Sequence, residues 1–160
     1  MRNRIFFLLF STPCLFITLL YAQTVNDMDG HVYKTIKIGK QVWFAENLNT
    51  THYKNGDSIP EAKTTEEWED CFRKEKGAWC YYDNDTANGK IYGKLYNWYA
   101  VNDPRGLAPK GWHVPTIKEW RSLSDNLGGQ NKAFERMKST KGFKAVPGGE
   151  RYYKNCMFYK

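Results

Sequence analysis

The chain has 160 residues, with 24 Lys and Arg against 17 Asp and Glu, and a formal net charge of +7 at pH 7. This length suffices for one hydrophobic core and is too short for two domains of ordinary size. Its lysines are scattered, without the arginine cluster or basic stripe that a nucleic-acid-binding surface needs. We therefore expect no nucleic-acid partner, and a solvated basic surface that can attract anionic polysaccharide.

An export signal is predicted over residues 1–22. Arg2 and Arg4 form a basic start, and residues 5–21 follow without a single charge. Ala22 then supplies the small residue that a signal peptidase requires. The pattern is typical of a secretory signal peptide that is cleaved after Ala22.

Two alternatives to cleavage concern the same segment. One is a membrane anchor, because about 20 apolar residues can span a bilayer; Pro13 disfavours such a continuous helix. The other is a lipid anchor on Cys14, which we do not expect because Cys14 lies in the middle of the apolar run. We expect residues 23–160 to be extracytoplasmic, secreted or at the cell surface, with no stable membrane span.

Three cysteines follow the signal: Cys71, Cys80 and Cys156. In an oxidising compartment any two of them can form a disulfide. Cys71 and Cys80 are close in sequence, and Lys76-Gly77 between them can turn the chain. This pair is therefore preferred, which leaves Cys156 over. The spacing matches no zinc site, and we expect no metal and no cofactor.

A β-hairpin is predicted near the start of the mature chain. Residues 26–30 read as a turn, residues 31–38 alternate as a strand does, and residues 41–45 form the return strand. Gly39-Lys40 lies between the two strands. A two-residue turn with glycine in first place is typical of a type II′ hairpin.

A short helix is predicted from residue 65 to about residue 74. Thr64 and Glu67 have the spacing of a capping box at its start. Trp68 and Cys71 lie three residues apart, and so they share one buried face of this helix.

The middle of the chain is rich in aromatic residues and turn formers. An aromatic strand is predicted over residues 77–82 and a loop over residues 83–89. Residues 95–101 are either a buried strand or a short helix, because the periodicity of so short a run does not decide between them. Residues 102–111 are predicted to be a loop.

Two helices and a strand are predicted after this loop. Thr116 and Glu119 repeat the capping pattern, and Gly128-Gly129 ends the helix that they begin. A second short helix covers residues 132–138, and residues 143–149 are a strand and turn. These elements indicate a small mixed α+β domain with an N-terminal hairpin, two to three short helices and twisted antiparallel strands. The apolar stripe of the first helix consists of Trp120, Leu123 and Leu127, and the second helix presents Ala133, Phe134 and Met137.

Several motifs follow one another between Asp27 and about Gly149: DMDGHVYKTIKIGKQVWFAENL, GAWCYYDND, YGKLYNWYAV, GLAPKGWHVPTIKEW, LGG and FKAVPGG. In this combination they resemble the Fibrobacter succinogenes major paralogous domain family. The resemblance implies a secreted or surface bacterial module. It implies no reaction, because this family has no established activity.

The segment Gly-Trp-His-Val-Pro-Thr-x-x-Glu-Trp is also similar to an element of formylglycine-generating sulfatase-modifying proteins. Those proteins are similar to C-type-lectin-like folds, so the resemblance implies a C-type-lectin-like arrangement. A degenerate enzyme of that kind is an alternative function. Such an enzyme would need a reactive cysteine pair or a copper–thiolate site, which Cys156 alone does not supply.

The C-terminal residues depart from the family. Members usually continue past Pro-Gly-Gly through an aromatic stretch to a terminal strand, whereas this chain ends at Lys160 after a different sequence. We therefore expect the terminal strand to be missing, which would leave a sheet edge uncovered. A truncated, non-functional paralogue is a third interpretation.

No catalytic residue is predicted. His113 lies in a tight aromatic loop, but no Cys or Ser partner accompanies it at a recognisable spacing. We expect His113 to form a structural hydrogen bond at the helix entrance, and Glu119 to serve as the capping partner of Thr116.

Two acidic turns are weak candidates for calcium, which prefers several oxygen ligands. Ala87 takes a ligand position in one turn, and Ile38 stands where the closing glutamate would be in the other. We therefore expect solvated turns and no metal site. The residues concerned are Asp83, Asp85 and Asn88 in one turn, and Asp27 and Asp29 in the other.

Aromatic residues make up 16% of the chain, and ring faces can stack on sugar rings. Core packing accounts for most of them first, because large aromatics dominate small cores. The predicted function is an exported, non-catalytic module that recognises or attaches to a glycan or protein, with the ligand-binding residues unassigned. The aromatic candidates for a sugar platform are Trp79, Tyr81, Tyr82, Tyr92, Tyr96, Trp98 and Tyr99.

Overall fold

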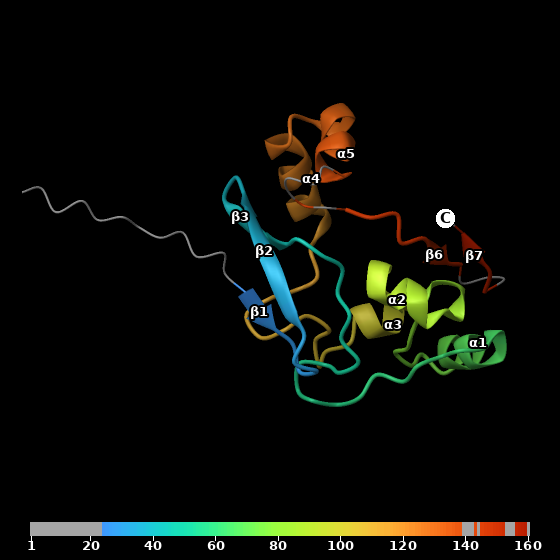
Figure 1. Cartoon of the computed structure of the whole chain (residues 1–160). Helices are drawn as coiled ribbons and strands as arrows, with labels where there is room; N and C mark the ends of the chain where they lie inside the picture. The colour runs from blue at the N-terminus through green and yellow to red at the C-terminus, as the bar shows by residue number, and fades with distance from the viewer. Residues whose placement is uncertain (1–23, 139–142, 144, 153–155, 160) are drawn as a thin grey trace, which may run out of the picture.

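The computed structural model describes residues 24–138, 143, 145–152 and 156–159, so the predicted signal peptide lies outside the described residues. Over these residues the chain is a mixed α+β domain with a small three-stranded antiparallel sheet and five α-helices (Figure 1). In chain order the elements are β1 (Thr24–Asn26), β2 (Val32–Ile38), β3 (Gln41–Phe44), α1 (Thr65–Arg73), β4 (Trp79–Cys80), the 3₁₀ helix η1 (Tyr82–Asn84), α2 (Thr86–Tyr92), β5 (Leu95–Tyr96), α3 (Trp98–Val101), α4 (Ile117–Asn126), α5 (Gln130–Lys138), β6 (Glu150–Arg151) and β7 (Phe158–Tyr159).

The predicted hairpin is confirmed as β2 and β3. Their register places Ile38 opposite Gln41, with Gly39 in the turn at φ 60°. A third strand, β1, pairs with the other edge of β2 and was not predicted, because a run of three residues is too short to establish a strand pattern. Within β2 the buried side chain is Tyr33, whereas Val32 is exposed. Alternation in β2 therefore locates the two faces without showing which one is buried.

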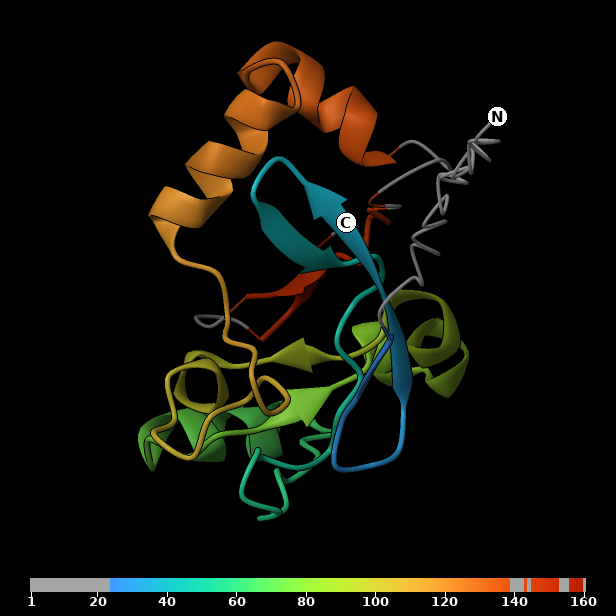
Figure 2. The same cartoon turned by 90° about the vertical axis from the view of Figure 1, so that its left-hand side faces the viewer.

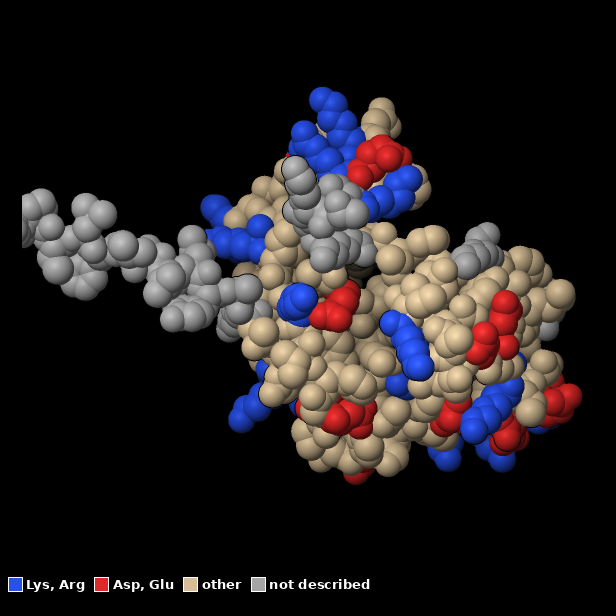
Figure 3. All heavy atoms as spheres, in the orientation of Figure 1, with Lys and Arg blue, Asp and Glu red and all other residues tan. Residues whose placement is uncertain are grey.

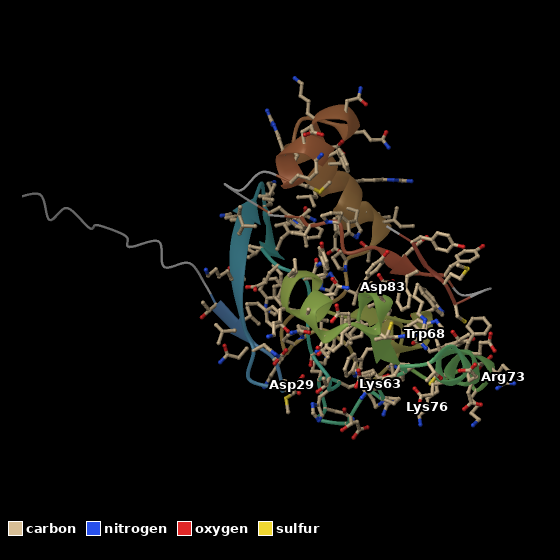
Figure 4. The ribbon with its side chains drawn as sticks, turned by 45° about the vertical axis from the view of Figure 1, so that its right-hand side comes forward. Asp29, Lys63, Trp68, Arg73, Lys76 and Asp83 are labelled. Carbon is tan, nitrogen blue, oxygen red and sulfur yellow. The ribbon has the colours of Figure 1, made fainter. Side chains whose placement is uncertain are left out.

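Helix α1 begins at the predicted capping box. The Glu67 backbone N–H donates to Thr64 Oγ1 over 3.2 Å, and the Thr64 N–H donates to Glu67 Oε2 over 3.2 Å. Trp68 is buried on the inner face of the helix, and Arg73 ends it (Figure 4). Trp68 packs with a small cluster of buried residues: Ala62, Ala78, Cys80 and Cys156.

The sequence did not decide whether residues 95–101 form a strand or a helix. The structure has a short strand, β5, followed by a short helix, α3. Asn97 separates β5 from α3, and its side chain is buried. Its Oδ1 accepts hydrogen bonds from the backbone N–H of Ala78 (3.0 Å) and of Ala100 (2.9 Å), so one side chain caps α3 and secures the start of β4. Beside it lies a second cluster of buried residues: Tyr53, Ile59, Trp79, Ala100 and Leu107.

The predicted loop over residues 83–89 is wrong, because this segment lies largely in η1 and α2. Asp85 caps α2 by accepting a 2.8 Å hydrogen bond from the Ala87 N–H. Gly89 suggested a turn, but it is a buried helical residue. A Cβ atom at Gly89 would overlap the ring of Tyr81. The absence of a side chain at Gly89 therefore allows the ring of Tyr81 to lie close to the backbone of α2.

Helices α4 and α5 form a pair that lies beyond the tip of the hairpin (Figures 1 and 2). Helix α4 starts at the predicted capping box, and Gly128 and Gly129 follow its end with φ of 94° and 86°. Helix α5 begins two residues earlier than predicted. A Cβ atom at Gly39 would overlap the side chain of Asn126, so the hairpin turn abuts the end of α4.

The predicted strand within residues 143–149 is wrong for the residues that are described there. Gly149 has φ 71°, which breaks extended structure, and the strand β6 starts only after it. Strand β6 pairs with β7 in antiparallel fashion, Arg151 lying opposite Phe158.

Arg151 attaches this strand pair to the rest of the domain. Its guanidinium is buried, and it donates to the carbonyl oxygens of Ala62 (3.0 Å), Thr64 (2.9 Å) and Cys156 (3.2 Å). It also lies 4.8 Å from the ring centroid of Trp68. One side chain therefore joins β6 to the segment before α1 and to α1 itself.

The cysteines lie in one region of the molecule. Cys80 and Cys156 belong to the same buried cluster, and Cys71 packs against it. All three are free thiols in the structure, so the bond between Cys71 and Cys80 is not formed there and stays a prediction for the oxidised protein. Burial raises the pKa of each thiol, which keeps them protonated and weakly nucleophilic.

Replacing Gly77 with alanine is expected to lower the free energy of unfolding by about 1–3 kcal/mol. The added Cβ would overlap the hydroxyl of Tyr53 and lie 3.0 Å from Ala100 Cα, and both residues are buried in the second cluster. Urea denaturation measures the effect. Gly148→Ala is the matched control, because its Cβ would meet no atom closer than 3.6 Å; equal losses for the two variants would contradict the packing argument.

Candidate ligand groove

A groove of about 620 Å³ lies among the hairpin, the residues after it, the loop before α4, the start of α4 and the segment around Phe143. In Figure 2, α4 and α5 lie on one side of β2 and β3, and the remaining body of the domain lies on the other. We call it the aromatic groove. Its principal ring-bearing residues are Trp43, Phe44, Trp112, Trp120 and Phe143.

The rings form two groups. In the first, Trp43 has centroid distances of 4.9 Å to Trp120 and 5.9 Å to Phe143. In the second, Phe44 lies 4.5 Å from Trp112. Trp43 is 6% exposed, whereas Trp120 is 45% exposed. Trp43 therefore forms the buried base of the groove, and Trp120 offers a solvent-facing aromatic surface.

The capping box of α4 positions one wall. Glu119 Oε2 accepts hydrogen bonds from the Thr116 N–H and hydroxyl, each 2.8 Å long, and Oε1 lies 2.8 Å from His113 Nε2. These bonds, first those from Thr116 and then that from His113, lower the pKa of Glu119 to about 2. As predicted, Glu119 is the capping partner of Thr116, and His113 is bonded at the helix entrance. Both residues line the groove.

Two buried polar atoms of groove residues have no hydrogen-bond partner among the residues that the structure describes. They are Gln41 Oε1, an acceptor, and Trp43 Nε1, a donor. Gln41 Nε2 makes only a long 3.4 Å bond, to the Glu119 carbonyl oxygen. A buried polar atom without a partner costs about 1–3 kcal/mol, and such atoms are few in native proteins. The base of the groove therefore has unused hydrogen-bonding capacity.

The groove is acidic although the chain as a whole is basic. Glu46 and Glu119 line it, and no Lys or Arg occurs among its described lining residues. The one basic lining side chain, His113, is paired with Glu119. Lysine, arginine and acidic side chains are interspersed over the face seen in Figure 3, without a large patch of either sign.

The turn between β1 and β2 holds the one group of potential metal ligands found in the described part of the chain. Atoms of Asp27, Asp29 and His31 lie within 4.8 Å of one another. Asp27 already accepts a 2.5 Å hydrogen bond from the Tyr33 hydroxyl. The side chains of Asp27 and Asp29 are 2% and 12% exposed, so the expectation of a solvated turn is wrong here.

Asp29 ties that turn to residues 50–52. It accepts hydrogen bonds from the Thr51 N–H, from the hydroxyls of Thr50 and Thr51, and from His52 Nδ1. Burial opposes ionisation of Asp29, but these hydrogen bonds outweigh it and lower the pKa to about 2. The carboxylates of Asp27 and Asp29 are thus used in hydrogen bonds within the domain.

The other acidic turn is also structural. Asp83 has φ 52° inside η1 and is exposed (Figure 4). Asp85 caps α2, and Asn88 donates a 3.0 Å hydrogen bond to the Tyr82 carbonyl oxygen.

The predicted aromatic platform is not the groove. Trp79 is buried in the second cluster and Tyr81 and Tyr96 pack against it, as the core-packing interpretation expected. Trp98 is 65% exposed on α3 and does not line the groove. The sequence did not indicate that the aromatic residues of the groove lie together, because they belong to segments that are far apart in the chain. The one available signal was Trp112 and Trp120, which flank a proline and a helix cap.

The fold and this site define a small α+β domain with an aromatic groove. Its sequence matches the family described as the Fibrobacter succinogenes major domain over residues 36–158, which is most of the chain. The chain therefore belongs to that family, as its motifs predicted, and the match extends past Gly149 into β7. The family is a paralogous domain family of unknown function.

Comparison with curated proteins and with solved structures gave no match. Among the helices of the described residues, none is long and apolar enough to cross a bilayer.

Proposed function

We propose that this protein is an exported, non-catalytic recognition module that binds a glycan or a protein through the aromatic groove. The observation that carries the proposal is the combination of exposed ring surface at Trp120 with unpartnered polar atoms on Gln41 and Trp43. Concave sites with apolar walls and a few convergent polar groups are the usual form of ligand pockets. The N-terminal segment with its basic start supports export.

A non-catalytic role agrees with the chemistry of the groove. Both carboxylate oxygens of Glu119 are engaged, one by His113 and the other by Thr116. With a pKa of about 2, Glu119 is ionised near neutral pH and is poorly suited to act as a general acid. His113 is held by Glu119 in turn. The pair therefore shapes the groove in our proposal and transfers no proton.

The alternative, a degenerate sulfatase-modifying enzyme, requires reactive cysteines. Cys80 and Cys156 are buried, burial raises the pKa of both thiols, and neither residue lines the groove. A C-type-lectin-like fold remains part of our proposal, supported by the similar Pro-Thr-x-x-Glu-Trp element at the start of α4. Bound copper at a cysteine of the purified protein would contradict the recognition module and favour the enzyme.

Trp120→Ala is expected to weaken ligand binding about tenfold, because the exposed ring surface of the groove is lost. Affinity electrophoresis of the mature chain, residues 23–160, measures this with a panel of neutral polysaccharides, acidic polysaccharides and surface-protein peptides. Trp98→Ala is the matched control: it removes a more exposed tryptophan outside the groove and should leave binding unchanged. Equal effects of the two variants, or no binding across the panel, would overturn the proposed function.

A further inference from the structure

We infer that the ligand of the aromatic groove is a neutral saccharide, bound by stacking of a sugar ring and by its uncharged hydroxyl groups. This inference rests on the proposed function and names its ligand class. It differs from what the net charge of +7 suggests, since a basic protein attracts anionic polymers to its surface.

The shape of the groove suits a sugar ring. Its volume of about 620 Å³ lies within the usual range for small-molecule sites. Trp112 precedes His113 in the chain and Trp120 follows Glu119, and each of the two tryptophans packs against a different residue of β3. Flat aromatic faces complement the C–H face of a pyranose ring, which is apolar, while the hydroxyls at the ring edge stay free to form hydrogen bonds.

Within the described part of the chain, the base of the groove has one acceptor atom and one donor atom without a partner, and hydroxyl groups can pair with both. Gln41 Oε1 lacks a donor and Trp43 Nε1 lacks an acceptor among the described residues. A hydroxyl group both donates and accepts, so neighbouring hydroxyls of one sugar match both atoms, which are buried and must turn toward the sugar on binding. A carboxylate or sulfate group only accepts, and an ammonium group only donates.

The charges at the groove exclude anionic sugars. Glu46 and Glu119 both carry negative charge there, and Glu119 stays ionised because Thr116 and His113 hold its carboxylate. A uronic acid or sulfated sugar would enter beside two like charges, with no lysine or arginine among the described lining residues to offset them. Glu46 and Glu119 therefore disfavour anionic ligands by charge repulsion, an effect that we call the charge filter.

A peptide strand fits the same site less well. Peptides that bind along a groove or sheet edge are held by rows of backbone donors and acceptors. The unpartnered groups found in this groove are instead two isolated side-chain atoms, on Gln41 and Trp43. This arrangement favours a ring with a few hydroxyls over an extended main chain.

Affinity electrophoresis tests the inference with soluble β-glucan, mannan and xylan as neutral probes and polygalacturonate as the acidic probe. We expect at least one neutral polymer to retard the mature chain through the groove, whereas any retardation by polygalacturonate arises at the basic surface and persists unchanged in Trp120→Ala. Gln41→Ala should weaken the neutral interaction about tenfold, as expected when a hydrogen bond to a buried polar group is lost. Trp98→Ala should leave it unchanged, and a thermal melt of each variant confirms folding.

The double variant Glu46→Gln, Glu119→Gln isolates the charge filter. Glutamine can still serve in a capping box, so α4 is kept while both charges are removed. The ratio of retardation by polygalacturonate to retardation by the neutral polymer should rise at least threefold above that of the wild type, and the rise should shrink as salt screens the charges. An unchanged ratio would overturn the charge filter.

The outcomes separate this inference from the function on which it rests. Groove-dependent binding of polygalacturonate or of a peptide, lost in Trp120→Ala, would overturn the neutral-sugar inference and leave the recognition function standing. Neutral-sugar binding that survives both Trp120→Ala and Gln41→Ala would place the site elsewhere and overturn both. Binding to no member of the full panel would overturn the proposed function itself.

Discussion

Replacing Arg151 with alanine is expected to lower the free energy of unfolding by about 3 kcal/mol, at roughly 1 kcal/mol for each buried carbonyl left without its donor. The three carbonyl oxygens belong to Ala62, Thr64 and Cys156. The guanidinium also lies 4.8 and 4.9 Å from the rings of Trp68 and Phe158, so its loss removes packing as well. Urea denaturation monitored by tryptophan fluorescence measures the change.

Arg105→Ala is the matched control for this prediction. Arg105 also makes several short bonds, to Asp103 and Asp57, and stacks over Tyr53 at 4.0 Å. Its side chain, however, is 40% exposed, and exposed ion pairs contribute at most about 1 kcal/mol. A loss for Arg105→Ala as large as that for Arg151→Ala would show that burial of the guanidinium is not the cause.

Stability is expected to fall by about 2 kcal/mol through Asp29 alone when the pH is lowered from 5 to below 2. The pKa of Asp29 is about 2 in the folded chain against 3.8 for a free side chain. Because the folded pKa is depressed, the contribution is complete above about pH 4 and is lost as the pH falls through 2. The unfolded chain takes up the proton first, and this drives unfolding.

The measurement is the difference in unfolding free energy between pH 5 and pH 2, for the wild type and for Asp29→Asn. The variant is less stable at pH 5, since an amide cannot accept from all the donors of Thr50, Thr51 and His52. Its pH dependence should be smaller than that of the wild type by about 2 kcal/mol. Asp70→Asn, at an exposed pair with Lys74, should leave the pH dependence nearly unchanged. If the unfolding free energy of Asp29→Asn depended on pH as strongly as that of the wild type, Asp29 would not be the source of the pH dependence.

Local patterns predicted those parts of the fold that local interactions determine. Both capping boxes, Thr64 with Glu67 and Thr116 with Glu119, form as their spacing indicated, because a capping box needs only residues within one turn. The turn at Gly39 is likewise local. The family could also be inferred from the order of the motifs.

Tertiary contacts decide the features that sequence reasoning missed. Gly89 suggested a loop, yet it lies in a helix where its missing Cβ admits the ring of Tyr81. Alternation in β2 did not reveal that Tyr33 faces inward, since the stacking of Tyr33 on Phe44 arises only once the hairpin has formed. Arg151 reads as a surface residue in sequence, and only the folded chain surrounds it with carbonyl oxygens.

The candidate site could not be predicted from the sequence, because it too is formed by tertiary contacts. Trp43 lies on β3 and Trp120 on α4, and their rings come within 4.9 Å only in the folded chain, where the hairpin turn also abuts the end of that helix. A search for paired catalytic groups finds His113 and Glu119 but cannot show that they form part of an aromatic wall. The nearest prediction placed the aromatic platform on residues 79–99, of which Trp79, Tyr81 and Tyr96 pack in the second cluster.

The assembly of the groove from distant parts of the chain has a practical consequence. The hairpin, the residues around the α4 cap and the segment at Phe143 must all be in place before the groove exists. A molecule that fills it binds the native chain and not the unfolded one, so by mass action it must raise the melting temperature. Candidate sugars can therefore be ranked by heating the protein with each of them, before any affinity is measured.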